Sequence, residues 1–235
     1  MTPTWQTDDG RVQLYLADCR DVLPHVKADA VVTDPPYGMN APTNHATRMT
    51  GMLCASNDYP PVYGDNAPFD PSPLCAFDTV LVWGANYFSK RLPGGGTWLV
   101  WDKRDGTGTN DYADCEIGWH SKNGSARLFR YLWNGCIKHG EKDTRRVHAT
   151  QKPIELMVWC IDLIGNPETI FDPYMGSGTT GVAAVRLGRR FIGVEIEPKY
   201  FEIAVRRIKD AIEQTALYEP TPRYVQATFQ SGEDG

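Results

Sequence analysis

A glycine-rich turn places the strongest constraint on how this 235-residue chain can fold. An apolar segment, residues 169–172, leads into Pro-Tyr-Met-Gly-Ser-Gly-Thr-Thr-Gly at 173–181, and residues 178–188 have a helical pattern rich in Ala and Val. Glycines let the backbone come close to a ligand, and a helix that begins there presents unpaired N–H groups. The segment therefore predicts a strand–turn–helix unit that binds a nucleoside cofactor, with a tight turn that binds nothing as the alternative.

The spacing around this turn narrows the choice of cofactor. Gly176, Gly178 and Gly181 match G-x-G-x-x-G, and Glu195 ends the next predicted strand, where a carboxylate can accept hydrogen bonds from ribose hydroxyls. No lysine follows the glycines, which excludes a phosphate-binding P-loop. Only one helix and a tail follow Glu195, so most of the sheet must precede the turn. This permuted order argues against a dinucleotide-dependent oxidoreductase.

Short apolar segments alternate with helical patterns along the chain. The predicted strands are 13–17, 29–33, 79–83, 97–101, 128–133, 169–172 and 191–195, and the predicted helices are 20–26, 86–92, 153–164, 178–188 and 198–213. Strands that are nearly all apolar suit a sheet buried on both faces. We therefore predict one α/β domain over residues 1–213, built on a doubly wound, mostly parallel sheet, followed by a flexible tail at 214–235.

A second motif, Asp-Pro-Pro-Tyr at 34–37, directly follows a predicted buried strand. Ligands bind at this end of the strands in an open α/β sheet. The prolines remove two N–H donors, so the segment offers acceptors, namely the Asp34 carboxylate and the Pro35 carbonyl. Such a pair suits an exocyclic –NH₂ group, and the Tyr37 ring can stack on the base that carries it. A proline-rich turn with a capping aspartate is the alternative when the motif is taken alone.

Charge is distributed unevenly along the chain, whose net charge is −5. Between residues 120 and 152 there are eight lysines and arginines against two acidic residues. A local positive patch can neutralise phosphates on an otherwise acidic protein. On charge alone, a solvated basic surface is an equal alternative.

Composition excludes several other classes of protein. The six cysteines are scattered without a C-x-x-C pair, which argues against a disulfide framework or a zinc site. No apolar run reaches the roughly 18–20 residues needed to cross a bilayer, and residues 1–5 lack a signal-peptide pattern. We therefore expect a cytoplasmic protein, bacterial or phage-encoded, with no metal and no membrane partner.

From Leu16 to about Ile208 the chain resembles the amino-methylating DNA methyltransferases of the beta arrangement, in which the D-P-P-Y segment precedes the glycine segment. The resemblance rests on residues 34–37, 171–180 and 148–153, the last with Ala149 in place of the family's proline. Residues 83–88 and 101–103 are similar to those of compact phage-type adenine methylases.

The resemblance implies a Rossmann-like fold in circularly permuted order and a specific reaction. A methyl group passes directly from S-adenosylmethionine to the N6 amine of a flipped adenine in double-stranded DNA. Asp34 favours adenine, because the cytosine N4 enzymes of the family more often carry serine there. Cytosine N4 remains the alternative.

The resemblance also assigns residues to roles. Asp34, Pro35, Pro36 and Tyr37 form the catalytic group. The expected cofactor contacts are Asp18, Cys19, Asp34, His148, Thr150, Gln151, Lys152, Asp172, Tyr174, Gly176, Ser177, Gly178, Thr179 and Glu195. Asp18 also has a structural alternative, as a helix cap.

In this family the sequence-reading segment lies between the catalytic and cofactor halves, which corresponds here to a small insertion at about 104–147. The expected DNA contacts are Lys122, Arg127, Arg130, Lys138, Lys142, Arg145 and Arg146. Residues 39–73 form a candidate loop for closing over the flipped base. The sequence leaves the recognition site open, together with the choice between monomer and homodimer.

Overall fold

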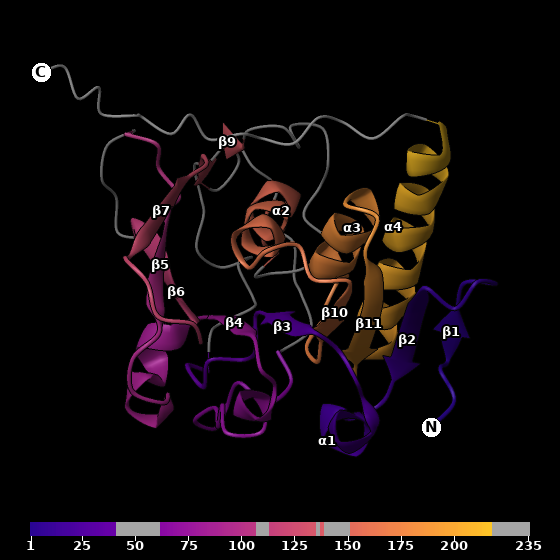
Figure 1. Ribbon diagram of the computed structural model, residues 1–235, viewed down its shortest axis with the longest axis horizontal. Coiled ribbons are helices and arrows are strands. Elements are labelled where there is room, and N and C mark those ends of the chain that lie inside the picture. The colour runs from indigo at the N-terminus through magenta and orange to yellow at the C-terminus, as the bar shows by residue number, and fades with distance from the viewer. Residues whose placement is uncertain (41–61, 107–112, 135–136, 139–150, 218–235) are drawn as a thin grey trace, which may run out of the picture.

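The computed structural model describes residues 1–40, 62–106, 113–134, 137–138 and 151–217. Nine strands form one sheet in the order β1-β2-β11-β10-β3-β4-β6-β5-β7 (Figure 1). These strands are β1 Trp5–Gln6, β2 Val12–Leu16, β3 Ala30–Thr33, β4 Val80–Trp83, β5 Thr97–Asp102, β6 Cys115–His120, β7 Arg127–Arg130, β10 Thr169–Asp172 and β11 Arg190–Glu195. The short strands β8, Trp133–Asn134, and β9, Ile137–Lys138, pair separately.

Most neighbouring strands of the sheet are parallel, as predicted. The run β2-β11-β10-β3-β4 is parallel throughout. The edge strand β1 is antiparallel to β2, and β6 runs antiparallel to both β4 and β5. The carboxyl ends of the five central strands therefore meet at one edge of the sheet, which is where the candidate site lies.

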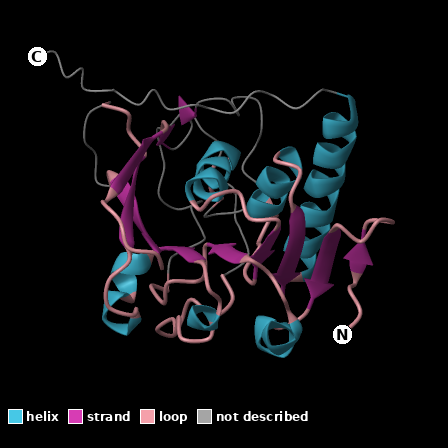
Figure 2. Ribbon diagram, viewed as in Figure 1, coloured by secondary structure: helices cyan, strands magenta, loops and turns pink. Residues whose placement is uncertain are grey.

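Helices cover both faces, which confirms the doubly wound arrangement. Helices α2 (Ile154–Leu163), α3 (Thr179–Arg186) and α4 (Pro198–Leu217) lie on one face, while α1 (Cys19–Val22) and short helical turns lie on the other (Figures 1 and 2). Every residue of β3 and β4 is buried, as expected for strands covered on both sides. No helix that the structure describes is both long and apolar enough to cross a membrane.

The glycine turn packs closely against the last helix. Gly178 precedes α3 with a φ of +80°, a conformation that L-residues rarely adopt. A Cβ atom at this position would lie 2.9 Å from the Ala204 Cβ atom on α4. Glycine therefore serves both the turn and the contact between α3 and α4.

Several sequence predictions need correction. The predicted helix at 86–92 is two 3₁₀ turns, at Ala85–Tyr87 and Ser89–Arg91, and the predicted strand at 128–133 is interrupted after Arg130. Strands β1 and β6 were missed, because β1 has two residues and β6 mixes Glu and Gly with apolar side chains. Helix α4 continues to Leu217, so the predicted tail begins with helical residues.

The window predicted as a recognition insertion also contributes to the main sheet. Both β6 and β7 fall inside residues 104–147. Because β6 lies between β4 and β5, it brings residues from this window to the wall of the candidate site.

Candidate active site

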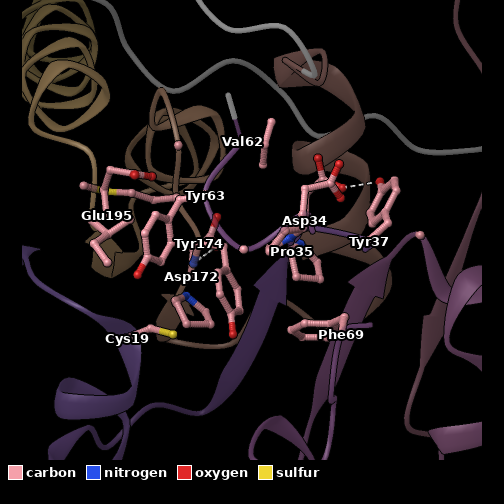
Figure 3. Close-up of a pocket in the computed structure, with 18 of the residues that line it drawn as sticks. Cys19, Asp34, Pro35, Tyr37, Val62, Tyr63, Phe69, Asp172, Tyr174 and Glu195 are labelled. Atoms are coloured by element: carbon pink, nitrogen blue, oxygen red, sulfur yellow. Dashed lines mark hydrogen bonds between the residues drawn. The ribbon is translucent and has the colours of Figure 1, made fainter. Parts of the chain in front are cut away.

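A cavity of about 1420 Å³ opens at the carboxyl ends of the central strands. It is lined by the segment 34–37 after β3, by the turn that follows β10, and by Glu195 at the end of β11. Figure 3 shows Asp34 and Tyr37 on one side and Glu195 on the other, with Asp172 and Tyr174 between them. The two sequence motifs, about 140 residues apart, therefore share one cavity.

Asp34 is held by two donors. The Tyr37 hydroxyl donates to Oδ1, and the Lys152 ammonium donates to Oδ2 at 2.6 Å. Lys152 Nζ also lies 3.1 Å from the Tyr37 oxygen. Burial raises the pKa of Asp34 above its usual value, although Lys152 opposes that effect. Both oxygens of the predicted acceptor are thus occupied by side chains in this structure.

The Tyr37 ring fits against the end of β4. Gly84 has a φ of +72°, and a Cβ atom there would overlap the Tyr37 ring. The Tyr87 ring stacks on Tyr37 with centroids 5.2 Å apart and an interplanar angle of 16°. Gly84 is therefore required for the observed position of the Tyr37 ring.

A second carboxylate contacts Lys152, and the sequence analysis did not identify it. Glu116 on β6 lies with Oε2 3.0 Å from Lys152 Nζ and with Oε1 3.0 Å from Lys103 Nζ. Burial acts to raise the pKa of Glu116, but Lys152 and Lys103 outweigh it and hold the pKa below its usual value. Burial likewise acts to lower the pKa of Lys152, but Asp34 and Glu116 raise it. Their mutual contact thus favours the charged forms of Glu116 and Lys152.

The cofactor half of the cavity carries two buried carboxylates. Asp172 accepts a hydrogen bond from the Thr33 hydroxyl at 2.6 Å and from the Tyr174 N–H at 3.1 Å. Burial raises the pKa of Asp172 to about 6. Glu195 accepts from the Glu197 N–H at 2.8 Å, and burial also raises its pKa. Acceptor groups therefore line this end of the cavity.

Arg207 on α4 anchors the glycine turn and was also missed by the sequence analysis. Its Nη1 atom lies 2.7 Å from the Ser177 carbonyl oxygen, 2.9 Å from Ser177 Oγ and 3.2 Å from Thr179 Oγ1. The partners are about 30 residues apart in the chain, so no local motif marks Arg207 as part of this site.

Most of the predicted site residues that the structure describes line this cavity. They are Asp18, Cys19, Asp34, Pro35, Pro36, Tyr37, Gln151, Lys152, Asp172, Tyr174, Gly176, Ser177, Thr179 and Glu195. Gly178 instead lies behind the turn, against α4. His148 and Thr150 lie outside the described residues.

Two of these residues make contacts within the protein besides lining the cavity. Asp18 caps α1 by accepting from the Arg20 N–H at 2.9 Å, which is the structural alternative predicted for it. Lys152, expected among the cofactor contacts, bonds to Asp34.

The loop after the D-P-P-Y segment is held by Asp65. Its Oδ1 atom accepts from the N–H groups of Gly38 at 2.8 Å and Met39 at 3.1 Å. Of the loop predicted to close over the base, 39–73, residues 39–40, 62–70 and 73 line the cavity, while 41–61 lie outside the described residues. The described part of this loop therefore belongs to the cavity wall.

The predicted DNA contacts whose side chains the structure describes do not lie together. Arg127 and Arg130 are exposed on the edge strand β7, and Arg130 Nε is 3.7 Å from an Asp102 oxygen. Lys122 follows Ser121, which bonds to Val80 at the beginning of β4, so it lies at the edge of the sheet opposite the cavity. Lys142, Arg145 and Arg146 lie outside the described residues, as does the side chain of Lys138.

Across the described ranges, no three His, Cys, Asp or Glu side chains are grouped so as to hold a metal ion. The cavity can instead supply carboxylate and carbonyl acceptors, a buried ammonium group and aromatic faces.

Comparison with known proteins identifies related sequences and folds. Residues 96–206 match a family model described as DNA methylase. The Type II methyltransferase M2.LlaDCHI of Lactococcus lactis subsp. cremoris is 34% identical over 112 residues, which cover 47% of this chain and 40% of the relative. The Type II methyltransferase M2.DpnII of Streptococcus pneumoniae is 34% identical over 113 residues, which cover 47% and 41%. The matched segment thus spans less than half of each curated relative.

Among solved structures, the fold is similar to that of the PvuII DNA methyltransferase (cytosine-N4-specific). The TM-score is 0.55 at 14% identity, and the match covers 91% of this chain and 94% of that one. This likeness confirms the predicted Rossmann-like fold.

Proposed function

We propose that this chain transfers a methyl group from S-adenosylmethionine to the N6 amine of adenine in DNA, because residues 96–206 match the DNA methylase family model and similar residues occur in Type II methyltransferases. The observation that carries the proposal is the shared cavity. It joins the acceptor pair of Asp34 and the Pro35 carbonyl to the glycine turn and Glu195.

The size of the cavity suits two ligands. Pockets for one small ligand usually measure roughly 300–1,000 Å³, and this cavity measures about 1420 Å³. A nucleoside cofactor and an extruded base can therefore occupy it together. Such an enzyme must extrude its target base, since the reacting amine is not accessible within the base stack.

The described residues fit the proposed cofactor. The carboxylate of Glu195 is placed to accept hydrogen bonds from ribose hydroxyls. Cys19 lies on the same side in Figure 3, and Asp18 lines the same cavity. Asp172, Gly176 and Ser177 would surround the methionine end. When bound, the cofactor supplies an electrophilic methyl group on a sulfonium centre.

The D-P-P-Y segment would prepare the target amine. An ionised Asp34 and the Pro35 carbonyl can each accept one N–H of the amine, which directs its lone pair away from the ring. Because the Tyr37 hydroxyl bonds to Oδ1 of Asp34, we propose that it gives up this bond when its ring stacks on the base. Lys152 can remain on Oδ2 and keep the carboxylate ionised. Positioning and hydrogen bonding then provide most of the catalysis.

Double-stranded DNA is the proposed substrate, and the bacterial cytoplasm the proposed location. Arg130 ends β7 opposite Asp102, at the end of the sheet that carries the cavity, where its exposed side chain can contact phosphates. All of the proposed reaction groups come from one chain, so the chemistry requires no residue from a second copy.

The test compares Asp34→Ala with Asp78→Ala, an exposed aspartate at the opposite edge of the sheet. Each protein is incubated with isotope-labelled S-adenosylmethionine and DNA from a host without methylases, and the nucleosides are then analysed. Wild type and Asp78→Ala should form N6-methyladenine. Asp34→Ala should lose at least about 10²–10³-fold in rate, with its cofactor affinity, measured by calorimetry, largely retained.

Three outcomes would contradict the proposal in different ways. N4-methylcytosine as the product would replace the adenine assignment. Substantial activity in Asp34→Ala would remove Asp34 from the reaction. No methylation of any DNA by the wild type would refute the activity itself, and genome-wide mapping of modified bases in an expressing host would check that result.

A further inference from the structure

Four side chains of alternating charge run through the wall of the cavity, in the order Lys103, Glu116, Lys152 and Asp34. Successive charged atoms are 3.0, 3.0 and 2.6 Å apart. We call these four residues the charge chain. It ends at the carboxylate to which the proposed function assigns the target amine.

All four members of the charge chain are shielded from solvent. The exposed fraction of the side chain is 5% for Lys152, 17% for Asp34, 20% for Lys103 and 24% for Glu116. Removing a charge from such a group leaves another charge without its partner, which is costly in a poorly solvated site. The two cations and two anions therefore balance one another.

The sheet holds the outer half of the charge chain in place. Glu116 lies on β6 opposite Trp101 of β5, and Lys103 follows the end of β5. The Lys103 N–H donates to the Asp114 carbonyl oxygen at 3.1 Å, which extends the pairing of these strands. Strand pairing thus fixes the backbone of Glu116, whereas the Lys152 ammonium group is carried on a flexible four-carbon stem.

We propose that Glu116 is a positioning residue for methyl transfer, which holds the Lys152 ammonium against Asp34 and thereby keeps the Asp34 carboxylate in place. This inference rests on the proposed function. It becomes important when the Tyr37 hydroxyl leaves Asp34, because Lys152 is then the remaining side-chain donor that the described contacts give to this carboxylate.

Removing the charge of Glu116 and removing the charge of Lys103 should shift the pKa values of Asp34 and Lys152 in opposite directions. The charged or titratable groups facing Lys152 and Asp34 are Glu116, Tyr37 and, on the cofactor side of Asp34, Asp172. Glu116→Gln removes a negative charge, so the pKa values of both Asp34 and Lys152 should fall. Lys103→Gln removes a positive charge and should raise both. The double variant removes one charge of each sign, so the two effects should largely cancel.

The experiment measures kcat/KM against pH for wild type, Glu116→Gln, Lys103→Gln and the double variant on methylase-free DNA. In Glu116→Gln, the acidic and alkaline limbs of the kcat/KM profile should both move to lower pH by about 0.5–1 unit. The kcat of this variant should fall about tenfold or more. Lys103→Gln should shift the limbs to higher pH, and the double variant should return them toward the wild-type positions. Thermal unfolding and cofactor affinity would show that each variant is folded.

A reduced rate with unmoved limbs would mean that Glu116 has only a structural role, and unchanged kinetics would also overturn the inference. If the wild type itself methylates no DNA, the proposed function fails instead. The positioning claim is then decided by NMR of ¹⁵N-lysine-labelled protein, with the Lys152 ammonium signal assigned from Lys152→Met. That signal should be protected from exchange in wild type and lose protection in Glu116→Gln; equal protection in both would refute the claim.

Discussion

Replacing Asp172 with asparagine is expected to stabilise the fold at alkaline pH while it weakens the site. The Asp172 side chain is buried, with 2% of the residue exposed, and its pKa is raised by burial to about 6 from 3.8. Asparagine has the same shape. Its oxygen can accept from the Thr33 hydroxyl and the Tyr174 N–H, and its amide can donate to the Thr180 hydroxyl oxygen.

The size of the effect follows from the pKa of Asp172. Because the pKa of Asp172 is higher in the folded protein than in the unfolded chain, binding of its proton stabilises the folded state. This stabilisation is complete below pH 3.8 and is lost as the pH rises through about 6. At about 1.36 kcal/mol per unit, ionisation in the folded state costs about 3 kcal/mol. The asparagine side chain does not ionise, so Asp172→Asn should be more stable than wild type by about 3 kcal/mol at pH 8 and by about zero near pH 4.

Urea unfolding followed by circular dichroism at pH 4, 6 and 8 would measure this difference. Asp210→Asn, at an exposed position on α4, is the matched control and should show a far smaller dependence of the difference on pH. Cofactor affinity measured on the same proteins should fall in Asp172→Asn, since the negative charge near the proposed methionine site is lost. A stability difference that does not change with pH, or a destabilised variant at pH 8, would refute the argument from burial.

Two further substitutions test contacts that support the site. Arg207→Met removes a cation from the Ser177 carbonyl and hydroxyl, and should weaken S-adenosylmethionine binding about tenfold in calorimetry. Arg206→Met, at an exposed neighbour, should leave binding unchanged, and equal effects of the two would contradict a specific role. Gly84→Ala places a Cβ atom where the Tyr37 ring lies, and should lower the methylation rate at least about tenfold with little change in cofactor affinity; wild-type kinetics would show that this ring position is not needed.

The two short motifs could be recognised from sequence because their information is local. The turn at 173–181 and the segment at 34–37 each follow an apolar strand, and both lie at the carboxyl ends of parallel strands as predicted. The buried runs in β3 and β4 likewise indicated a sheet covered on both faces. Such features depend on backbone geometry and on patterns over a few residues, so one sequence is enough to predict them.

Other parts of the site depend on contacts between distant segments. Glu116 was missed because it lies on β6, whose mixed polar and apolar composition did not predict a strand. Glu116 reaches Lys152 because β6 inserts between β4 and β5. Arg207 reaches Ser177 through the packing of α4 on the glycine turn.

The sequence by itself thus determined the α/β class, the order of the two motifs, and the acceptor character of Asp34 and Pro35. Only the tertiary structure decided what Asp34 bonds to and which charges surround it. The reason is physical: backbone preferences act between near neighbours, whereas burial and ion pairing depend on which strands and helices lie side by side.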